Sequence, residues 1–236
     1  MVTREQKLSA DLRPDIIKRL VQILLLLLFQ AALLFVSAGR LDWLWAWVYI
    51  GLFVIAVSVN ATLMFRRNPE TIARRASGEG AKSWDKIVTR LWGVAGVLQL
   101  VIAGFDERYG ASGVLPLLVH SIGVAIFVLG FGLFSWAMIT NAYFATVVRV
   151  QQGSGHTVCT TGPYQFVRHP GYVGSILEAL ALPLLLGSLW ALIPGVLATV
   201  FIIMRTAMED RTLQAELSGY SDYAQRVRYR LLPRVW

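Results

Sequence analysis

The chain has 236 residues, of which 56% are hydrophobic and only 15% are charged. Soluble domains are about a quarter charged, so this composition excludes an ordinary soluble domain and indicates an integral membrane protein. The net charge of +8 is spread over the connections between apolar runs. That distribution argues against a nucleic-acid partner and favours contact with anionic membrane lipids.

Long apolar runs predict the membrane helices, because about 20 helical residues cross a hydrocarbon core of roughly 30 Å. The first four expected spans are 20–39, 43–65, 88–105 and 114–142. A fifth run, 172–204, is too long for one span and contains Pro183, Gly187 and Pro194, so it predicts a tight hairpin of two short helices. The sequence therefore predicts an all-α, polytopic membrane protein with about six transmembrane helices, the last two forming the hairpin.

Positively charged residues are distributed unevenly between the connections. Of the 22 Lys and Arg residues, 20 lie in segments expected on one side of the membrane, and only Arg40 and Arg108 lie on the other. The four rich segments are 1–19, 66–90, 149–169 and 205–236. Because positively charged connections stay in the cytoplasm, both termini are expected there.

The chain changes character after residue 142. Residues 1–142 hold a basic arm and four spans, whereas residues 143–236 hold a polar loop, the hairpin and a charged tail. We expect the two parts to form one membrane domain. Apolar residues of the tail recur at spacings of four and three, which predicts an amphipathic helix kinked at Ser218-Gly219 and folded back beneath the membrane domain. They are Leu213, Leu217, Tyr220, Ala224, Val227 and Leu231.

Two kinds of site are disfavoured by the residues present. Cys159 is the single cysteine, so no intramolecular disulfide and no cysteine-built metal cluster can form, and no metal site is predicted. Gly130 and Gly132 lie inside an apolar span and not after a strand, so the nucleotide-binding fingerprint of soluble α/β enzymes is missing.

A polar segment between two apolar runs could bind a ligand. Gly162-Pro163 predicts a turn, and His169-Pro170 predicts an extended residue before the next helix begins. Such a backbone offers free N–H and C=O groups, the rings of Tyr164 and Tyr172 offer flat faces, and His156 can hold a carboxylate. A helix that begins at Pro170 also favours an anionic group at its first turn.

A second polar cluster follows the hairpin. Arg205 and Glu209 are four residues apart, hence on one helix face. An arginine and a carboxylate at this position could simply anchor the helix at the membrane boundary. Both clusters flank the same hairpin, however, so they should return to one surface within reach of each other.

The two clusters resemble the isoprenylcysteine carboxyl methyltransferase family. The pattern Gly-x-Tyr-x-x-x-Arg-His-Pro-x-Tyr-x-Gly is present without a break from Gly162 to Gly174. It is followed by the hairpin, by Arg-x-x-x-Glu-Asp from Arg205, by Gly-Tyr-x-x-Tyr from Gly219 and by Arg-Leu-Leu-Pro from Arg230. The resemblance covers about residues 141–236, and the earlier helices match only as generic spans.

The resemblance implies a membrane methyltransferase of prokaryotic type, in an inner or plasma membrane. It would use S-adenosyl-L-methionine, release S-adenosyl-L-homocysteine, and be reached by its donor from the cytosol. Arg205 and Glu209 become the catalytic candidates. The implied cofactor-binding residues are His156, Val158, Gly162, Pro163, Tyr164, Arg168, His169, Pro170, Tyr172, Gly174 and Asp210. Asp210 stands where the family pattern has a second Glu, and Ser218 where a Phe often precedes the Gly, which leaves the substrate open.

The acceptor would be lipophilic and come from the bilayer, with a carboxylate, thiol or amine as the methylated group. Asn141 and Tyr143 either line its pocket or only pack. Glu178, inside the hairpin, is a functional group, a side chain that snorkels to the membrane surface, or a partner of Arg168. His120 and Asn60 are expected to form interhelical hydrogen bonds.

Two other functions stay open. Sterol-reductase-type membrane enzymes that use NADPH carry a similar Arg-His-Pro-x-Tyr-x-Gly segment, usually followed by Asp, whereas Ser175 stands here. The chain could also be a non-enzymatic lipid-binding membrane protein. The sequence does not predict an oligomeric state.

Overall fold

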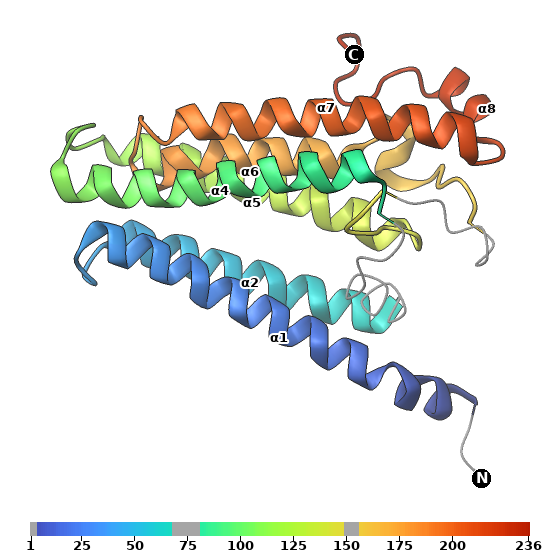
Figure 1. Cartoon of the computed structure of the whole chain (residues 1–236), viewed down its shortest axis with the longest axis horizontal. Coiled ribbons are helices and arrows are strands. Elements are labelled where there is room, and N and C mark those ends of the chain that lie inside the picture. The colour runs from blue at the N-terminus through green and yellow to red at the C-terminus, as the bar shows by residue number, and fades with distance from the viewer. Residues whose placement is uncertain (1–3, 68–80, 149–155) are drawn as a thin grey trace.

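The computed structural model describes residues 4–67, 81–148 and 156–236. The secondary structure of these residues is entirely helical, which confirms the predicted fold class (Figure 1). The helices are α1 (Arg4–Ala38), α2 (Leu44–Arg67), α4 (Ser83–Tyr109), α5 (Leu117–Thr140), α6 (Pro170–Leu186), α7 (Leu192–Glu216) and α8 (Tyr220–Arg226). A single 3-10 turn, η2 (Gly162–Gln165), precedes α6.

Five helices in the described part of the chain are long and apolar enough to cross a membrane. These spans are Ile17–Ala38, Leu44–Met64, Ser83–Tyr109, Leu117–Thr140 and Leu192–Glu216. The sixth apolar helix, α6, has 17 residues and is about 26 Å long. The hairpin differs from the prediction in one respect, because its second arm is not short: α7 continues for 25 residues to Glu216. Arg205 and Glu209 therefore lie within a helix and not at its end.

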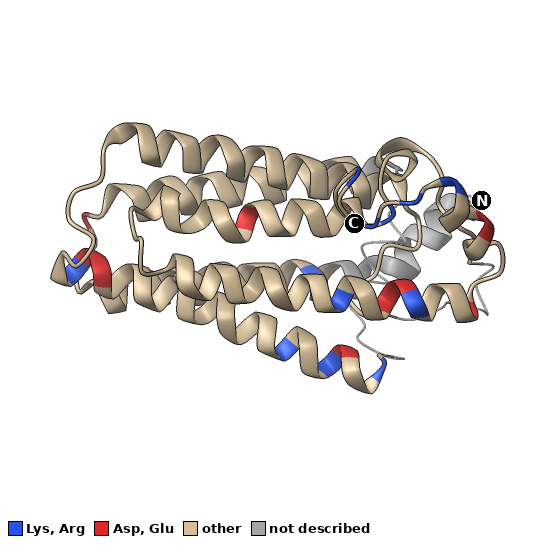
Figure 2. Cartoon of the chain, turned by 90° about the horizontal axis from the view of Figure 1, so that it is seen from above, with Lys and Arg blue, Asp and Glu red and all other residues tan. Residues whose placement is uncertain are grey.

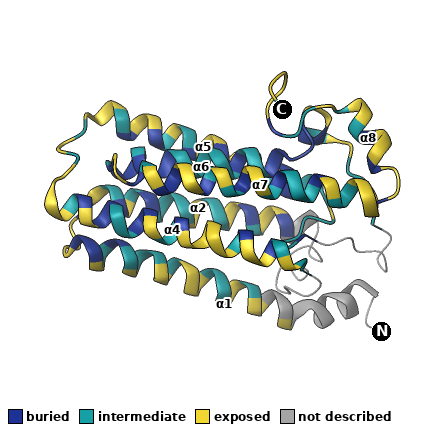
Figure 3. Ribbon diagram, turned by 45° about the horizontal axis from the view of Figure 1, so that its top comes forward, coloured by how far each residue is buried: buried dark blue, intermediate teal, exposed yellow. Residues whose placement is uncertain are grey.

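The helices form two groups. Helices α4, α5, α6 and α7 form a bundle, and α1 and α2 lie together against one side of it, α1 on α4 and α2 on α5 and α6 (Figure 1). Helix α6 contacts α2, α4, α5 and α7, so it lies at the centre and carries much of the buried surface (Figure 3). The N-terminal part of α1, α8 and the C-terminal tail lie toward the same end of the molecule, here called the α8 end.

Glycines allow α5 and α6 to approach closely, and these two helices share the largest contact in the bundle. A Cβ atom on Gly130 would lie 2.8 Å from the carbonyl oxygen of Gly174, and one on Gly174 would lie 2.5 Å from the carbonyl oxygen of Gly130. Real side chains do not tolerate such distances. The small residues therefore fix where the two helices cross.

Polar side chains inside the bundle join neighbouring helices. The Nδ1 atom of His120 lies 2.9 Å from the carbonyl oxygen of Leu185, and its ring stacks on Trp45 with the centroids 4.0 Å apart. Asn60 donates to the hydroxyl of Ser135 across 3.1 Å. Both residues are thus interhelical hydrogen-bonding groups, as the sequence predicted.

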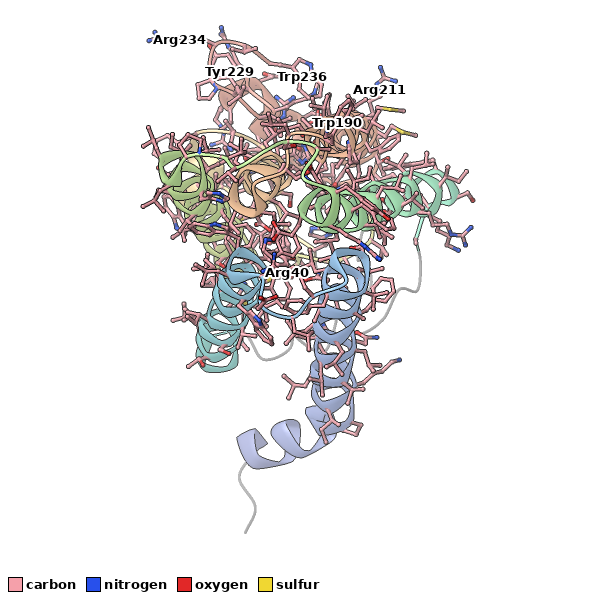
Figure 4. The ribbon with its side chains drawn as sticks, turned by 90° about the vertical axis from the view of Figure 1, so that its left-hand side faces the viewer. Arg40, Trp190, Arg211, Tyr229, Arg234 and Trp236 are labelled. Atoms are coloured by element: carbon pink, nitrogen blue, oxygen red, sulfur yellow. The ribbon has the colours of Figure 1, made fainter. Side chains whose placement is uncertain are left out.

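The end opposite α8 is closed by its own charged cluster. Asp106 accepts hydrogen bonds from Ser112 and from the Ser188 hydroxyl, the latter at 2.5 Å. Arg40 lies 3.4 Å from Glu107 and joins the α1–α2 connection to the end of α4 (Figure 4). Between the two ends, the helices carry very few charged side chains (Figure 2). This is the charge distribution of a protein that crosses a membrane.

The tail after α7 is not one kinked helix. Helix α7 ends at Glu216, and Gly219 has a φ of +78°, a conformation that any other residue adopts only with strain. The chain then forms only the short α8 before it turns irregular. The expected apolar stripe is therefore split between two helices and a loop.

Candidate active site

A buried ion pair ties the loop before α6 to α7. Arg168 donates from Nε and Nη2 to the two carboxylate oxygens of Asp210, at 2.7 and 2.9 Å. The side chain of Asp210 is fully buried and that of Arg168 is 6% exposed. A planar, two-point contact of this kind fixes both the distance and the orientation of the two groups.

Asp210 has further donors around it. Arg230 and Gln214 each donate to Oδ2 at 2.8 Å, and the Tyr220 hydroxyl donates to Oδ1 at 2.9 Å. The Nε2 atom of His169 lies 3.3 Å from the same oxygen. Asp210 therefore joins α7, α8, the tail and the residue before α6 at one buried carboxylate.

The tail is held mainly through its backbone. Arg168 donates from Nη1 to the carbonyl oxygens of Val227 and Arg228, both at 3.0 Å. The backbone N–H groups of Arg168 and His169 donate to the carbonyl oxygens of residues 229 and 230, each at 2.9 Å. The tail consequently lies beside the loop that precedes α6.

A second buried aspartate holds Arg205. Asp85 on α4 is 1% exposed, and its carboxylate accepts from Nε of Arg205 at 2.7 Å and from Nη2 at 3.3 Å. Asp85 also accepts from the backbone N–H of Val148 at 2.8 Å, and Nη2 of Arg205 donates to the carbonyl oxygen of Thr146 at 2.9 Å. The pair thus fixes the 141–148 segment against α4 and α7.

Aromatic rings lie beside the catalytic candidates. The guanidinium carbon of Arg205 lies 5.4 Å from the centroid of the Tyr172 ring, and the Tyr172 hydroxyl donates to Glu209. The ring of His169 stacks on the ring of Tyr172, with the two centroids 5.7 Å apart. Tyr143 and His156 stack on each other with centroids 4.4 Å apart.

These groups surround a cavity of about 400 Å³. Ligand sites in proteins occupy about 300–1,000 Å³, so this space suits a small molecule. One wall is polar and comes from the 141–148 segment, residues 156–159, α7 and α8. The apolar part of the lining, here called the apolar wall, includes Leu26, Trp92, Phe134, Phe201 and Ile202 of four helices.

Ten of the residues singled out from the sequence line this cavity. They are Asn141, Tyr143, His156, Val158, Tyr164, Arg168, His169, Tyr172, Arg205 and Glu209. Arg205 and Glu209 face the same space, as their spacing predicted. They have different partners, because Arg205 binds Asp85 and Glu209 binds Tyr172.

Six others do not line the cavity, and most of them shape the backbone around it. Gly162 has a φ of +57°, and a Cβ atom there would lie 2.9 Å from the Thr140 hydroxyl. Pro163 and Pro170 are buried at the start of η2 and α6, Gly174 contacts α5, and Asp210 lies beneath the wall as the anchor of Arg168. These positions fit a structural role better than ligand contact.

Glu178 also lies away from the cavity. It does not pair with Arg168, whose carboxylate partner is Asp210. Its Oε1 atom is buried and has no hydrogen-bond partner among the described residues. The predicted alternative of a Glu178–Arg168 pair is therefore wrong.

Several residues at the site were not predicted from the sequence. Asp85, which holds Arg205, had only one signal: it is a carboxylate at the polar start of the third apolar run. Arg19 lines the cavity from α1, where the sequence predicted only a basic arm. Cys159, for which the sequence analysis named no role, is part of the wall as well.

The protonation of the loop and tail groups follows from their burial. Burial raises the pKa of Tyr164, Tyr220 and Tyr223 above the usual tyrosine range, so these hydroxyls stay protonated donors at neutral pH. Burial also raises the pKa of the Cys159 thiol. Among the described residues, no three His, Cys, Asp or Glu side chains are grouped as metal ligands would be.

The chain is similar to two known proteins. It is 28% identical over 156 residues to the cobalt-zinc-cadmium resistance protein CzcN of Cupriavidus metallidurans, which is 62% of this chain and 66% of that protein. The chain thus spans just under two thirds of that relative. The solved structure of the eukaryotic intramembrane Ras methyltransferase ICMT aligns with a TM-score of 0.45 and 17% identity, over 92% of this chain and 99% of that one.

The model of the isoprenylcysteine carboxyl methyltransferase (ICMT) family matches residues 122–215. This stretch runs from α5 to the end of α7 and contains the loop before α6, the Arg168–Asp210 pair and both catalytic candidates. Residues 122–215, which hold the candidate site, are therefore similar to the isoprenylcysteine carboxyl methyltransferase family.

Proposed function

We propose that the protein is an integral membrane methyltransferase that uses S-adenosyl-L-methionine and methylates a lipophilic acceptor from the bilayer. The observation that carries this proposal is that polar and apolar residues line the same cavity. Its polar wall is built by the loop before α6, by α7 and by α8, and its apolar wall by membrane helices. A polar donor and an apolar acceptor could meet there.

The residues of the polar wall fit the donor. Residues 157 and 158 line the cavity, and their backbone groups have no hydrogen-bond partner in the part of the chain that the structure describes, so they can bind the edge of a base. The rings of His169 and Tyr172 offer flat faces, and Glu209 offers a carboxylate for an ammonium or hydroxyl group. When bound, the donor supplies an electrophilic methyl group on a sulfonium.

The chain's own contribution is alignment and exclusion of water. Arg205 is fixed by Asp85 and Thr146, and Glu209 by Tyr172, so both face the cavity without needing to reorganise. The apolar wall removes water from an attacking group, which strengthens its interactions with the fixed charges. Arg168 also holds the tail beside the loop that precedes α6.

The positive-inside pattern supports a cytoplasmic position for the α8 end, where the donor would enter. The acceptor would reach the apolar wall from the membrane. The match of residues 122–215 to the family model supports methyl transfer, while the identities of the donor and the acceptor are inferred from the residues that line the cavity.

The test is calorimetric binding of S-adenosyl-L-homocysteine to the protein in lipid nanodiscs. We expect micromolar binding by the wild type. His169→Ala should weaken it about tenfold or more, because a ring and a hydrogen-bonding group are lost from the wall. His120→Ala is the matched control: both histidines are 6% exposed, but His120 lies on α5 against Leu185, outside the cavity wall.

Equal weakening by both variants would assign the effect to general destabilisation. If the folded wild-type protein binds NADPH but not S-adenosyl-L-homocysteine, the proposal is wrong and a reductase function is favoured. Binding of neither compound would favour a non-enzymatic lipid-binding protein.

A further inference from the structure

We infer that Arg19 binds an anionic group of the acceptor that is separate from the methylated atom, so that the acceptor is an anionic amphiphile. The inference rests on the proposed function and names the substrate class of the same cavity. It follows from where Arg19 lies on α1, from the donors that its guanidinium leaves free, and from the exposed residues beside it.

Arg19 lies on the face of α1 that packs on the bundle. Leu26 follows it after about two helical turns, and both side chains line the cavity. Ser37 follows after about five turns, and there α1 is so close to α4 that a Cβ atom on Gly104 would overlap the serine hydroxyl. Lys18 is exposed and does not line the cavity. An arginine that only anchored α1 among the headgroups would point outward as Lys18 does, so the position of Arg19 indicates contact with a ligand.

The guanidinium of Arg19 has donors to offer. The other two lining arginines, Arg168 and Arg205, each bind a buried aspartate. Arg19 donates from Nη1 to Gln22 on its own helix, at 3.2 Å, and its Nε and Nη2 atoms bond to no residue in the described part of the chain. These two atoms form one of the planar, two-point faces by which arginine binds phosphate and carboxylate groups.

The formal charges around the cavity leave that of Arg19 uncompensated. Two groups of ion-paired or hydrogen-bonded side chains lie at the polar wall, one with an arginine and two carboxylates and one with two arginines and a carboxylate, so together they cancel. They are Arg205, Asp85 and Glu209, and Arg168, Arg230 and Asp210. Bound S-adenosyl-L-methionine would add a further positive charge, because its sulfonium and ammonium outnumber its carboxylate. In a site with little water, an anionic acceptor balances these charges.

The cavity is open to the membrane beside Arg19. Leu26 on α1 and Trp92 on α4 line it, yet they are 46% and 38% exposed. Both belong to helices long enough to cross a membrane, so their exposed surfaces face lipid chains. Arg19 is near the start of the span Ile17–Ala38, at the depth of the headgroups. An amphiphile can therefore place its apolar part against the two helices while its anionic group contacts Arg19.

The anion at Arg19 is not the group that reacts. The catalytic candidates Arg205 and Glu209 line the cavity from α7, whereas Arg19 lines it from α1. Helix α4 packs against both of these helices and lies between them (Figure 1). The acceptor therefore has one group at Arg19 and another at the catalytic candidates. This arrangement admits a carboxylate, a thiol or an amine as the methylated group.

The experiment measures how an amphiphile protects Cys159, the single cysteine, which lines the same cavity as Arg19. The protein is placed in phosphatidylcholine nanodiscs, and alkylation by iodoacetamide is followed as dodecyl phosphate is added. Dodecanol, which has the same chain and no charge, is the control ligand. We expect dodecyl phosphate to protect at a mole fraction about tenfold lower than dodecanol, because charge-assisted hydrogen bonds hold it at Arg19. Equal protection by the two, or protection by neither, would overturn the inference.

Arg19→Gln should remove the tenfold preference for dodecyl phosphate, whereas Arg19→Lys should keep most of it because the charge is retained. Lys18→Gln is the matched control. It removes the same charge from the same turn of α1, but from an exposed side chain outside the cavity lining, and should keep the full preference. An equal loss in Lys18→Gln would assign the preference to general surface charge and contradict the role of Arg19.

Nanodiscs with about a quarter of phosphatidylglycerol distinguish two sources of the anion. If phosphatidylglycerol itself protects Cys159 in the wild type but not in Arg19→Gln, the anionic group is a phospholipid headgroup in the cavity. If protection still requires dodecyl phosphate, the acceptor is a smaller amphiphile than a bilayer lipid. If phosphatidylglycerol abolishes the preference for dodecyl phosphate without protecting Cys159, Arg19 binds lipid outside the cavity and the inference is wrong.

Calorimetric binding of S-adenosyl-L-homocysteine separates the inference from the proposed function. Arg19→Gln should leave this binding unchanged, because the donor is expected at the polar wall. If the wild type does not bind the product but shows protection that depends on Arg19, the proposed function fails and the anion site remains. If the wild type binds the product and Arg19→Gln keeps the tenfold preference, the inference alone fails.

Discussion

Two buried aspartates organise the arginines of the α8 end in different ways. Asp210 has five donors around it and does not reach the cavity, so its charge holds the loop and tail in place. Asp85 also lies outside the lining, but its partner Arg205 faces the ligand space. Removing either carboxylate would leave an arginine buried without its counter-charge, which costs about 3–5 kcal/mol.

Cys159 offers a direct probe of the cavity, because it is the single cysteine and lines the wall. Burial raises its pKa, so little thiolate is present at neutral pH and alkylation by iodoacetamide should be slow. The rate should increase steeply as the pH rises above the usual thiol pKa of about 8.5. Mass spectrometry of the labelled protein measures it.

Bound S-adenosyl-L-homocysteine should protect Cys159 from the reagent at every pH. A rate that is unaffected by saturating product would place the donor elsewhere in the protein. A rate that is already maximal at neutral pH would show that the thiol is not buried as described.

At the scale of elements, the contact between α5 and α6 positions the site, because α6 carries Tyr172 and begins at the loop that contains Arg168 and His169. Gly130 and Gly174 face each other across this contact. The motif residue Gly174 is explained by helix packing and not by ligand contact.

Gly130→Ala should lower the free energy of unfolding by about 1–3 kcal/mol, because the added methyl group overlaps the α6 backbone. Gly132→Ala on the same helix is the control, since a Cβ atom there meets no atom within 4 Å. It should leave stability unchanged or raise it by up to about 1 kcal/mol through helix propensity. Thermal unfolding followed by circular dichroism compares the two, and equal effects would contradict the close packing.

The helices themselves could be predicted from the sequence, because apolar runs of membrane length need no partner to be recognised. The length of α7 could not, because its last three turns are polar and resemble a tail. The break at Gly219 was predicted only as a kink, since a glycine permits both a bend and a left-handed residue, and tertiary contacts decide between them.

At the scale of the whole molecule, the cavity lies toward the α8 end, where the tail covers helices that would otherwise face water. The motif residues of the loop and of α7 could be predicted because they follow an unbroken local pattern. Asp85 could not, because it meets Arg205 across 120 residues of sequence, and helix packing alone determines that contact. The apolar residues of the cavity wall could not be predicted either, because helix packing alone brings them together.

The orientation in the membrane can be measured with single cysteines in a Cys159→Ala background. Leu41→Cys lies in the exposed connection between α1 and α2, and Gln225→Cys lies on the exposed side of α8. In intact cells, a membrane-impermeant maleimide should label only position 41, because the positive-inside rule places α8 in the cytoplasm. Labelling of position 225 alone would reverse the topology, and permeabilised cells, where both react, serve as the control.

Arg168 donates hydrogen bonds to backbone carbonyl oxygens of α8 and the tail, and every amino acid has such a carbonyl. These hydrogen bonds therefore place almost no demand on the exposed side chain at position 228, whereas Ala224 and Val227 also pack against the buried cluster around Tyr164 and Tyr223. Position 228 can vary while the tail keeps its path. Sequence divergence in this stretch is then a poor measure of functional divergence, and Arg168 itself is the position to inspect first when a relative is compared.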